Sequence, residues 1–250
     1  LGGWNMKNVL VTGSTGTLGE EILRLLLKNN YNVIGHYNKN WERAYELEKE
    51  LGIEFIKCDL TNENDIDNMV NYLINKYEHI DILINNAAFY YDEPLEEKTK
   101  DTFMKVLDTN LVGPFLLSRE IAKYMLDNKY GKIINVASTN GIDTYYPESI
   151  DYDASKAGLI NLTKNLAKYY APYICVNAIA PGWIETKDTL NMDESFIKEE
   201  KEKILLNRFG SPYEIARSIL FLCENDYIDG EIIRIDGGKR WIYLNKQKKI

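Results

Sequence analysis

The sequence lacks any apolar stretch near the roughly 18 uninterrupted residues that a membrane-spanning helix needs. Its first residues, Leu1-Gly2-Gly3-Trp4-Asn5, also lack a basic region followed by an apolar run, so they do not form a signal peptide. We expect Met6 to be the natural start and residues 1–5 to be an added remnant. We therefore expect neither a membrane-spanning helix nor a signal peptide.

Positive charge is in short supply. The chain has 30 Lys and Arg residues against 38 Asp and Glu residues, which gives a net charge of −8 and a sequence pI near 5.0. An excess of negative charge disfavours a broad nucleic-acid-binding surface and docking on anionic membranes. We therefore expect neither nucleic acid nor a membrane as a partner.

Cysteine is also scarce. The three cysteines, Cys58, Cys175 and Cys223, are odd in number, far apart and set in apolar contexts. This pattern predicts buried free thiols in a reducing cytoplasm rather than a disulfide framework. We expect a cytoplasmic protein without a metal site.

Short apolar runs alternate with amphipathic stretches along the whole chain. Near-continuous apolar strands suit a sheet covered on both faces, and strand–helix alternation implies a parallel sheet. The pattern predicts one α/β domain over residues 6–250, a doubly wound parallel sheet of about seven strands with helices on both faces. Helical patterns lie near 19–29, 40–51, 63–78, 98–128, 151–170 and 212–224, and strands near 8–12, 32–36, 54–58, 81–85, 132–137, 174–178 and 231–235.

A charged stretch at 183–211 breaks this rhythm, and its length predicts a lid or binding segment. The basic tail at 246–250 is expected to fray.

Tyr152 and Lys156 form a pair with the spacing of one helical turn. A cation beside a phenol lowers the phenol pKa, and bringing it from about 10 to roughly 7 takes about 4 kcal/mol, which a lysine and an oxidised nicotinamide ring could supply. Two further pairs, Tyr45/Lys49 and Tyr72/Lys76, lie in polar amphipathic stretches typical of solvated helix faces. Only Tyr152/Lys156 follows a strand end that carries a serine, Ser138. This arrangement predicts an acid–base site for moving a hydride to or from a carbonyl.

A glycine loop follows the first strand and precedes a helix. Glycines let the backbone approach a pyrophosphate, and the helix N-terminus presents N–H groups to it. The expected phosphate-binding residues are Gly13, Ser14, Thr15, Gly16, Leu18 and Gly19.

The second predicted strand ends in Gly35-His36-Tyr37-Asn38-Lys39, without the acid that would bind the ribose 2′-hydroxyl of NAD. The absence of this acid, with Lys39 and His36 nearby, favours NADP over NAD. Asn38 and Lys39 are the expected contacts.

Taken in order, these motifs resemble the short-chain dehydrogenase/reductase family from Lys7 to Gly238. The middle glycine falls at Gly16, whereas the common form of the family would place it at Thr17, and Ala88 stands where the family usually has glycine. The loop also lacks the arginine that many NADP-using members carry. The resemblance rests on the glycine loop, Asp59-Leu60, Asn85–Ala88, Thr109–Gly113, Ser138, Tyr152, Lys156, Asn177–Gly182, Asp229–Glu231 and Asp236–Gly238.

The resemblance implies a Rossmann-type fold and a role for each matching residue. Tyr152 would be the general acid–base, Ser138 would hold the substrate oxygen, and Lys156 would bind the nicotinamide ribose and tune Tyr152. Asn110 would anchor a water that links Lys156 to solvent. The remaining expected cofactor contacts are Asp59 and Leu60 at the adenine, Asn86 at its ribose, and Pro181, Gly182 and Ile184 at the nicotinamide.

The last third, with Leu206–Pro212, looks most like 3-oxoacyl-(acyl-carrier-protein) reductases and related sugar and polyol dehydrogenases. An acidic carrier protein would need basic contacts. Lys129 could provide one, whereas Ala171-Pro172-Tyr173 provides none. The expected pocket is aromatic, with Phe89, Tyr90, Tyr91, Tyr145, Tyr146 and Trp183.

The expected function is an NAD(P)-dependent oxidoreductase for a small carbonyl or alcohol, such as a 3-oxoacyl thioester. A dinucleotide-binding sensor without turnover and an isomerase or dehydratase remain as alternatives. The resemblance also implies a homotetramer that uses the 98–128 and 151–170 helices at one interface and the C-terminal strand and helix at another.

Overall fold

The computed structural model describes residues 6–239. Seven parallel strands form one sheet in the order β3-β2-β1-β4-β5-β6-β7, which confirms the predicted doubly wound α/β fold. The strands are β1 (Asn8–Val11), β2 (Asn32–Tyr37), β3 (Glu54–Lys57), β4 (Ile82–Asn85), β5 (Gly131–Val136), β6 (Ile174–Pro181) and β7 (Ile232–Ile235). The expected basic tail lies outside the described residues.

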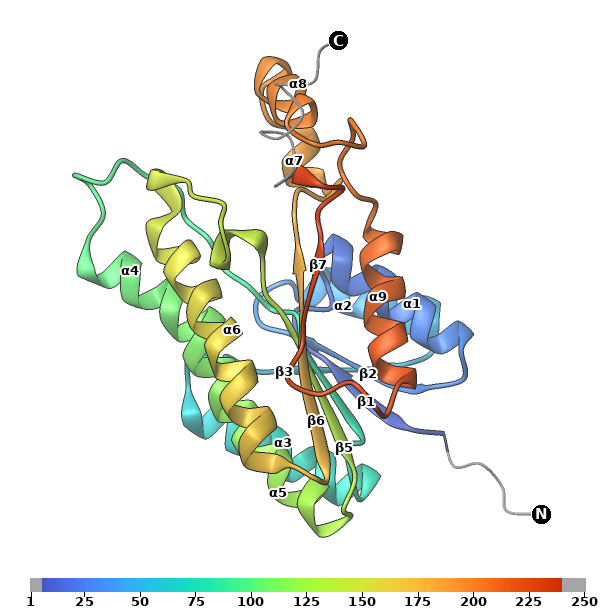
Figure 1. Ribbon diagram of the computed structural model, residues 1–250. Coiled ribbons are helices and arrows are strands. Elements are labelled where there is room, and N and C mark those ends of the chain that lie inside the picture. The colour runs from blue at the N-terminus through green and yellow to red at the C-terminus, as the bar shows by residue number, and fades with distance from the viewer. Residues whose placement is uncertain (1–5, 240–250) are drawn as a thin grey trace.

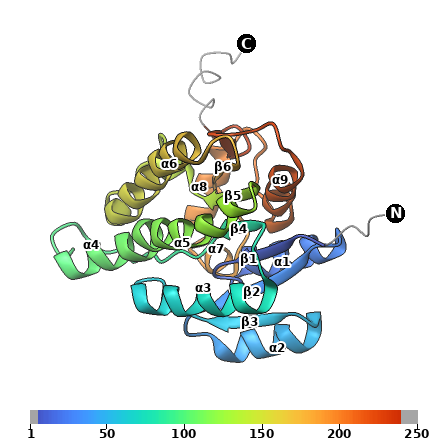
Figure 2. The ribbon, with the colours of Figure 1, turned by 90° about the horizontal axis from the view of Figure 1, so that it is seen from below.

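Helices cover both faces of the sheet, as Figures 1 and 2 show. The helices α1 (Thr17–Lys28), α2 (Trp41–Leu51) and α9 (Pro212–Glu224) lie on one face. The helices α3 (Glu63–Tyr77), α4 (Lys100–Leu107), α5 (Gly113–Asp127) and α6 (Ile150–Tyr170) lie on the other. Each face has its own apolar core, because strands covered on both sides bury alternate side chains in opposite directions.

The stretch predicted as one helix over 98–128 is interrupted. A π-helical turn, η1 (Asp108–Val112), separates α4 from α5. Asn110, fully buried, lies inside this turn. Such turns are rare and occur frequently at functional sites, and the apolar periodicity of the sequence carries no sign of the extra residue.

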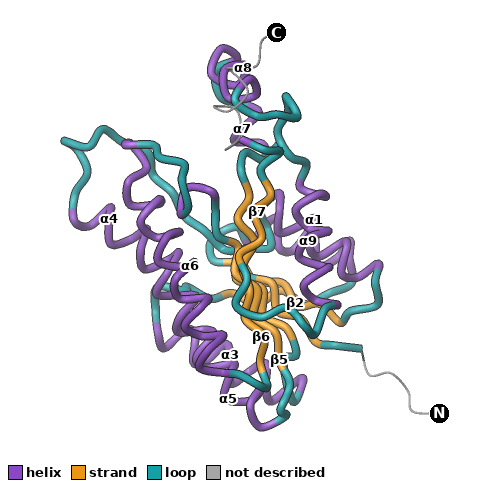
Figure 3. The backbone as a smooth tube through the Cα atoms, viewed as in Figure 1, coloured by secondary structure: helices purple, strands orange, loops and turns teal. Residues whose placement is uncertain are grey.

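The 183–211 segment contains two short helices, α7 (Lys187–Leu190) and α8 (Glu194–Glu202). Figure 1 shows both beyond the carboxyl ends of the strands, and Figure 3 shows loops gathered at the same end. Two 3-10 turns, η2 (Thr139–Gly141) and η3 (Pro147–Ser149), lie between β5 and α6. In doubly wound sheets ligands bind beyond the carboxyl ends of the strands, so the segment is placed where a lid would be.

Of the helices in the described part of the chain, none is long and apolar enough to cross a lipid bilayer. Cys58, Cys175 and Cys223 are free thiols. Cys58 and Cys223 are buried as predicted, whereas Cys175 is only half-buried.

Candidate active site

The glycine loop is held tightly between the first two strands and the end of β4. Gly13 has φ +62°, a left-handed conformation that favours glycine, and a Cβ there would lie 2.6 Å from Ala87 Cα. A Cβ on Gly19 would lie 2.5 Å from the Gly13 oxygen, so α1 packs directly against the loop. The sequence motif therefore reflects two real close contacts of the backbone.

The first turn of α1 has no side-chain cap. Its N-cap residue is Gly16, whereas the N-cap side chains of α2, α3, α8 and α9 accept hydrogen bonds from the first-turn amides. The first N–H groups of a helix have no intrahelical partner. At Gly16 a Cβ would meet nothing closer than 3.6 Å, so the displaced middle glycine leaves this helix end open.

Three residues predicted to contact the phosphates are wholly or partly buried within the protein. Ser14 is fully buried, and its hydroxyl exchanges hydrogen bonds with the His36 backbone at 3.0 and 2.7 Å. Leu18 packs against the core on the α1 side, and Thr15 is half-buried. Thr17, which the sequence marked only as a departure from the family pattern, lines a cavity that also contains Ser138 and Tyr152.

His36 does not supply the positive charge expected near the cofactor. It is 2% exposed, its Nδ1 accepts a hydrogen bond from the Gly13 N–H, and its Nε2 lies 3.0 Å from the Cys58 oxygen. Burial lowers the pKa of His36 to about 4, with the Cys58 hydrogen bond opposing the change. The ring is therefore neutral and supports the glycine loop, which corrects the use of His36 as a reason to favour NADP.

The end of β2 carries no acid, as the sequence shows. Lys39 is exposed there, and Asn38 donates to Asp59 across the gap to the end of β3. Burial alone would raise the pKa of Asp59, but hydrogen bonds from Thr61 and Asn38 and the charge of Lys39 lower it. Asp59 is thus an ionised carboxylate that already has several partners.

Two other predicted cofactor residues have structural contacts. The Leu60 side chain is 4% exposed and belongs to the core on the α3 side. The Asn86 amide donates to the Thr12 and Gly13 oxygens at 2.9 and 3.2 Å. Thr12, not singled out from the sequence, accepts from the Asn86 and Ala87 N–H groups at 3.0 Å each, so it joins the glycine loop to the end of β4.

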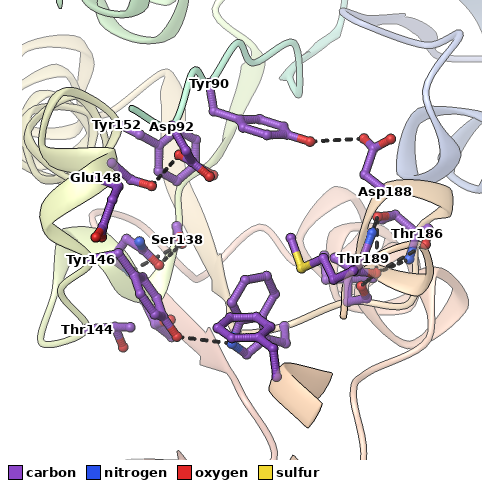
Figure 4. A pocket seen from close by; sticks show the side chains of 18 of the residues that line it. Tyr90, Asp92, Ser138, Thr144, Tyr146, Glu148, Tyr152, Thr186, Asp188 and Thr189 are labelled. Atoms are coloured by element: carbon purple, nitrogen blue, oxygen red, sulfur yellow. Dashed lines mark hydrogen bonds between the residues drawn. The ribbon is translucent and has the colours of Figure 1, made fainter. Parts of the chain in front are cut away.

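One cavity of about 500 Å³ brings distant segments together (Figure 4). Thr17 enters from α1, Ser138 from the end of β5, Tyr152 from α6, and Gly182 and Ile184 from the end of β6. Buried Pro181 ends β6 just before them. The predicted catalytic serine and tyrosine therefore face the same space as the start of α1.

Lys156 lies on the same side of α6 as Tyr152, with its Nζ 5.4 Å from the centre of the phenol ring. It is 2% exposed and donates to the Val136 oxygen at 2.8 Å. Burial lowers the pKa of Lys156 to about 8. The spacing thus brings the two side chains together, but the ammonium donates its hydrogen bond to the last carbonyl of β5 and not to the phenol oxygen.

The pKa of Tyr152 is raised in this structure, whereas a lysine and an oxidised nicotinamide acting together would lower it. Burial raises it to about 12, and the charge of Asp153 adds to the rise, whereas the Ser138 hydroxyl opposes it. The phenol is therefore protonated at neutral pH. The lysine alone does not activate the phenol, because the cost of removing a phenolate from water outweighs the effect of the nearby ammonium.

The Asn110 side chain makes three hydrogen bonds within the protein. Its amide donates to the Phe89 oxygen at 2.8 Å and to Ser155 Oγ at 3.1 Å, and its Oδ1 accepts from the Phe89 N–H at 2.7 Å. It therefore joins the π-helical turn to the segment after β4 and to the helix that carries Tyr152. This side chain is positioned to hold the site together.

The cavity wall is aromatic, as predicted, but only half of the expected rings take part. Tyr90, Tyr146 and Trp183 line the cavity. Tyr145 is 74% exposed and Tyr91 is 49% exposed. Residues that the sequence did not single out as site residues complete the lining: Asp92, Thr139, Asn140, Thr144, Glu148, Ser149, Thr186, Asp188, Thr189, Met192, Phe196 and Lys239.

Asn140 shows why such residues are hard to find in a sequence. Its N–H donates to Ser138 Oγ at 3.2 Å, and its amide donates to Asp153 at 2.6 Å. A polar residue soon after a strand is typical of any turn, and only the contact with Asp153, 13 residues later, shows that Asn140 is held in place beside Ser138.

Comparison with known proteins agrees with this geometry. A family model described as Enoyl-(Acyl carrier protein) reductase matches residues 13–240. A 3-oxoacyl-(acyl-carrier-protein) reductase of Aquifex aeolicus is 37% identical over 241 residues, covering 93% of this chain and 96% of the relative. An acetoacetyl-CoA reductase of an Acinetobacter species is 33% identical over 242 residues, covering 93% and 97%.

The crystal structure of a short-chain dehydrogenase from Bacillus anthracis superposes with a TM-score of 0.84 at 32% identity, covering 94% of this chain and 96% of that chain. Together with the ordered motifs and the cavity that holds Ser138 and Tyr152, these matches show that the chain belongs to the short-chain dehydrogenase/reductase family of oxidoreductases.

Proposed function

We propose that this enzyme reduces the carbonyl group of a small substrate with a nicotinamide cofactor. The observation that carries the proposal is the cavity in which Ser138 and Tyr152 lie with Thr17 at the start of α1. The start of α1 fits the pyrophosphate of a dinucleotide, because its first N–H groups lack a side-chain cap and the helix dipole favours an anion there. The cofactor would supply the hydride.

Each side chain has a defined task in this proposal. The hydroxyls of Ser138 and Tyr152 hold the substrate oxygen, and Tyr152 gives its proton as negative charge develops there. A positioned acid of this kind contributes roughly 10²–10⁴ in rate. Because the pKa of Tyr152 is raised to about 12, the phenol is protonated in the free protein and can donate a proton to the substrate oxygen.

Lys156 and Asn110 complete the proposed acid–base group. Lys156 would contact the nicotinamide ribose and return a proton to Tyr152, which its pKa of about 8 permits near neutral pH. Asn110 would keep the π-helical turn against Phe89 and Ser155 and could direct a water toward Lys156. Pro181, Gly182 and Ile184 would border the nicotinamide.

We propose NADP rather than NAD as the cofactor. The end of β2 offers Asn38 and the exposed ammonium of Lys39 and no carboxylate. A 2′-phosphate there meets one cation, and it would also lie near ionised Asp59, whose charge Asn38, Thr61 and Lys39 compensate. Gly13, Ser14, Thr15, Gly16, Leu18 and Gly19 would surround the pyrophosphate, and Leu60 and Asn86 would border the adenosine through their backbone.

The substrate class is proposed as small ketones, with 3-oxoacyl thioesters first among them, since two relatives are named for reducing such compounds. Lys129 precedes β5 and Ser138 follows it, so the six-residue strand separates them by about 20 Å. A carrier protein held at Lys129 would therefore have to reach the cavity from the opposite end of β5.

The decisive experiment is oxidation of NADPH and NADH against a panel of ketones, sugar ketones and 3-oxoacyl thioesters, with wild type and Tyr152→Phe. We expect turnover with NADPH that falls at least about 100-fold in the variant. Nucleotide binding without any oxidation, unchanged by the substitution, would instead indicate a sensor. Substrate conversion without a net change in nicotinamide absorbance would indicate an isomerase or dehydratase.

We further propose one domain over residues 6–250, a reducing cytoplasmic environment in keeping with three free thiols, and a homotetramer. Light scattering at micromolar concentration tests the last point, because a mass near the 28.9 kDa of a single chain would reject it.

A further inference from the structure

Glu200 is a buried carboxylate, and burial of a charged group is energetically unfavourable. It lies in α8, within the 183–211 segment, and is 2% exposed. Its Oε2 accepts from Trp183 Nε1 at 2.7 Å, the Tyr146 hydroxyl at 2.8 Å and Lys239 Nζ at 2.7 Å, and its Oε1 accepts from Lys203 Nζ at 2.7 Å. A buried carboxylate is stable only when it has partners such as these.

The partners come from separate parts of the fold. Tyr146 precedes α6, the helix of Tyr152; Trp183 follows the end of β6; and Lys239 follows the end of β7. All three side chains line the cavity, whereas Glu200, among the described residues, is not part of the lining. One oxygen of Glu200 thus fixes three cavity-lining side chains from behind.

Aromatic packing joins Tyr146 and Trp183 to neighbouring rings, so that this side of the cavity is an aromatic wall. Trp183 stacks on Phe209 at 5.7 Å with an interplanar angle of 26°, and it meets the edge of Phe196 at 5.7 Å and Tyr146 at 5.8 Å. The indole Nε1 also donates to the Tyr146 hydroxyl at 3.2 Å, and Figure 4 shows Tyr146 on the same side of the cavity as Ser138. Ring packing has little directional preference, so the hydrogen bonds to Glu200 add a directional restraint on Tyr146 and Trp183.

The position of Lys239 depends on the negative charge of Glu200. Lys239 Nζ contacts Glu200 and the Tyr146 hydroxyl, and it lies 6.0 Å from the centre of the Trp183 ring. Removing only the negative charge leaves a half-buried ammonium beside the wall without its counter-ion. Loss of one partner of a buried pair costs much more than the pair itself contributes.

We propose that Glu200 is a positioning residue that fixes Tyr146 and Trp183 as the substrate-facing wall of the cavity, opposite which the carbonyl group meets Ser138 and Tyr152. The inference rests on the proposed reduction of a carbonyl compound and adds which part of the protein selects the rest of that substrate. The wall fits flat or apolar groups attached to the carbonyl, because aromatic faces bury such groups well.

The primary test compares Glu200→Gln with Glu199→Gln. Glu199 is the adjacent residue of α8, lies on the surface and also contacts Lys203 at 2.7 Å, so it controls for the loss of one charge in the same helix. For Glu200→Gln we expect KM for a ketone carrying a flat or apolar group to rise at least about 10-fold, the ratio that loss of one charge-assisted hydrogen bond produces. The kcat and the KM for NADPH should stay within about threefold, and Glu199→Gln should match wild type.

A second readout does not depend on turnover. Acrylamide quenching of Trp183, taken as the difference between each protein and its Trp183→Phe counterpart, should increase in Glu200→Gln and not in Glu199→Gln. If the wall opens but no variant oxidises NADPH, including wild type, the proposed function fails and the role of Glu200 stands. If wild type turns over and Glu200→Gln keeps both the KM and the quenching of wild type, the positioning role is refuted. A fall in kcat alone, with KM and quenching unchanged, would show a general structural effect and would also refute it.

If Glu200→Gln does not fold, Lys203→Met replaces it, since Lys203 contacts Glu200 Oε1 and is not part of the cavity lining. We expect the same two changes at about threefold in KM. Wild-type behaviour of Lys203→Met would then overturn the proposal.

Discussion

Burial of Lys156 should lower the stability of the folded enzyme at neutral pH, and Lys156→Met should reveal this. The side chain is 2% exposed, and burial lowers its pKa from 10.5 to about 8. Methionine keeps the unbranched stem and removes the charge. If Lys156 has the role proposed above, the substitution should gain stability and lose activity, as expected where an active site holds an unfavourable group.

The magnitude follows from the pKa difference. A shift of this size corresponds to about 3 kcal/mol of unfavourable burial while the lysine is charged in both states. Loss of the hydrogen bond to the Val136 oxygen offsets roughly 1.5–3 kcal/mol of that gain. Lys156→Met should thus be as stable as wild type at pH 7 or more stable by about 1 kcal/mol, while reductase activity falls at least about 100-fold.

The pH dependence is the sharper test. Between pH 8 and 10.5 the unfolded lysine holds its proton and the folded one does not, so wild-type stability rises with pH in this window. The rise attributable to this residue is about 2.5 kcal/mol from pH 7 to pH 10. Lys156→Met lacks it, and other titrating groups cancel in the difference between the two proteins.

Urea unfolding of wild type and variant at pH 7 and pH 10 measures this difference. A stability difference that is the same at both pH values would show that Lys156 is not buried as a charged group, and the proposed proton return through it would lose its basis. A catalytically active Lys156→Met would equally refute the assigned role.

Three further predictions concern other parts of the structure. Burial alone would raise the pKa of Glu200, but its hydrogen bonds lower that pKa from 4.5 to about 2. The ionised carboxylate therefore contributes stability above about pH 4.5 that is lost as the pH falls toward 2. The melting temperature of Glu200→Gln should decline less than that of wild type over this range, and parallel curves would contradict the assignment. Gly19→Ala places a methyl 2.5 Å from the Gly13 oxygen and should cost about 1–3 kcal/mol in urea unfolding, whereas Gly16→Ala, with no contact under 3.6 Å, should stay within about 0.5 kcal/mol; equal costs would refute the close packing. Lys39→Ala should raise KM for NADPH about 10-fold and leave KM for NADH unchanged, and an equal effect on both would argue against a 2′-phosphate at Lys39.

The sequence was sufficient for the number of strands and for the proximity of Tyr152 and Lys156, because both depend on local patterns. Apolar runs predicted all seven strands, and a spacing of one helical turn was enough to place Lys156 beside Tyr152. The glycines at 13 and 19 mark positions where the backbone itself makes contact. Such features depend on residues that are close together in the sequence, and the rest of the fold changes them little.

The protonation states were decided by the tertiary structure. Burial keeps Tyr152 protonated and His36 neutral, whereas the sequence suggested an activated phenol and a cation. The π-helical turn at Asn110 and the contacts of Glu200 with Trp183 and Lys239 join residues that no periodicity connects. Desolvation and hydrogen bonding depend on which atoms surround a group after folding, and that surrounding is assembled from segments far apart in the chain.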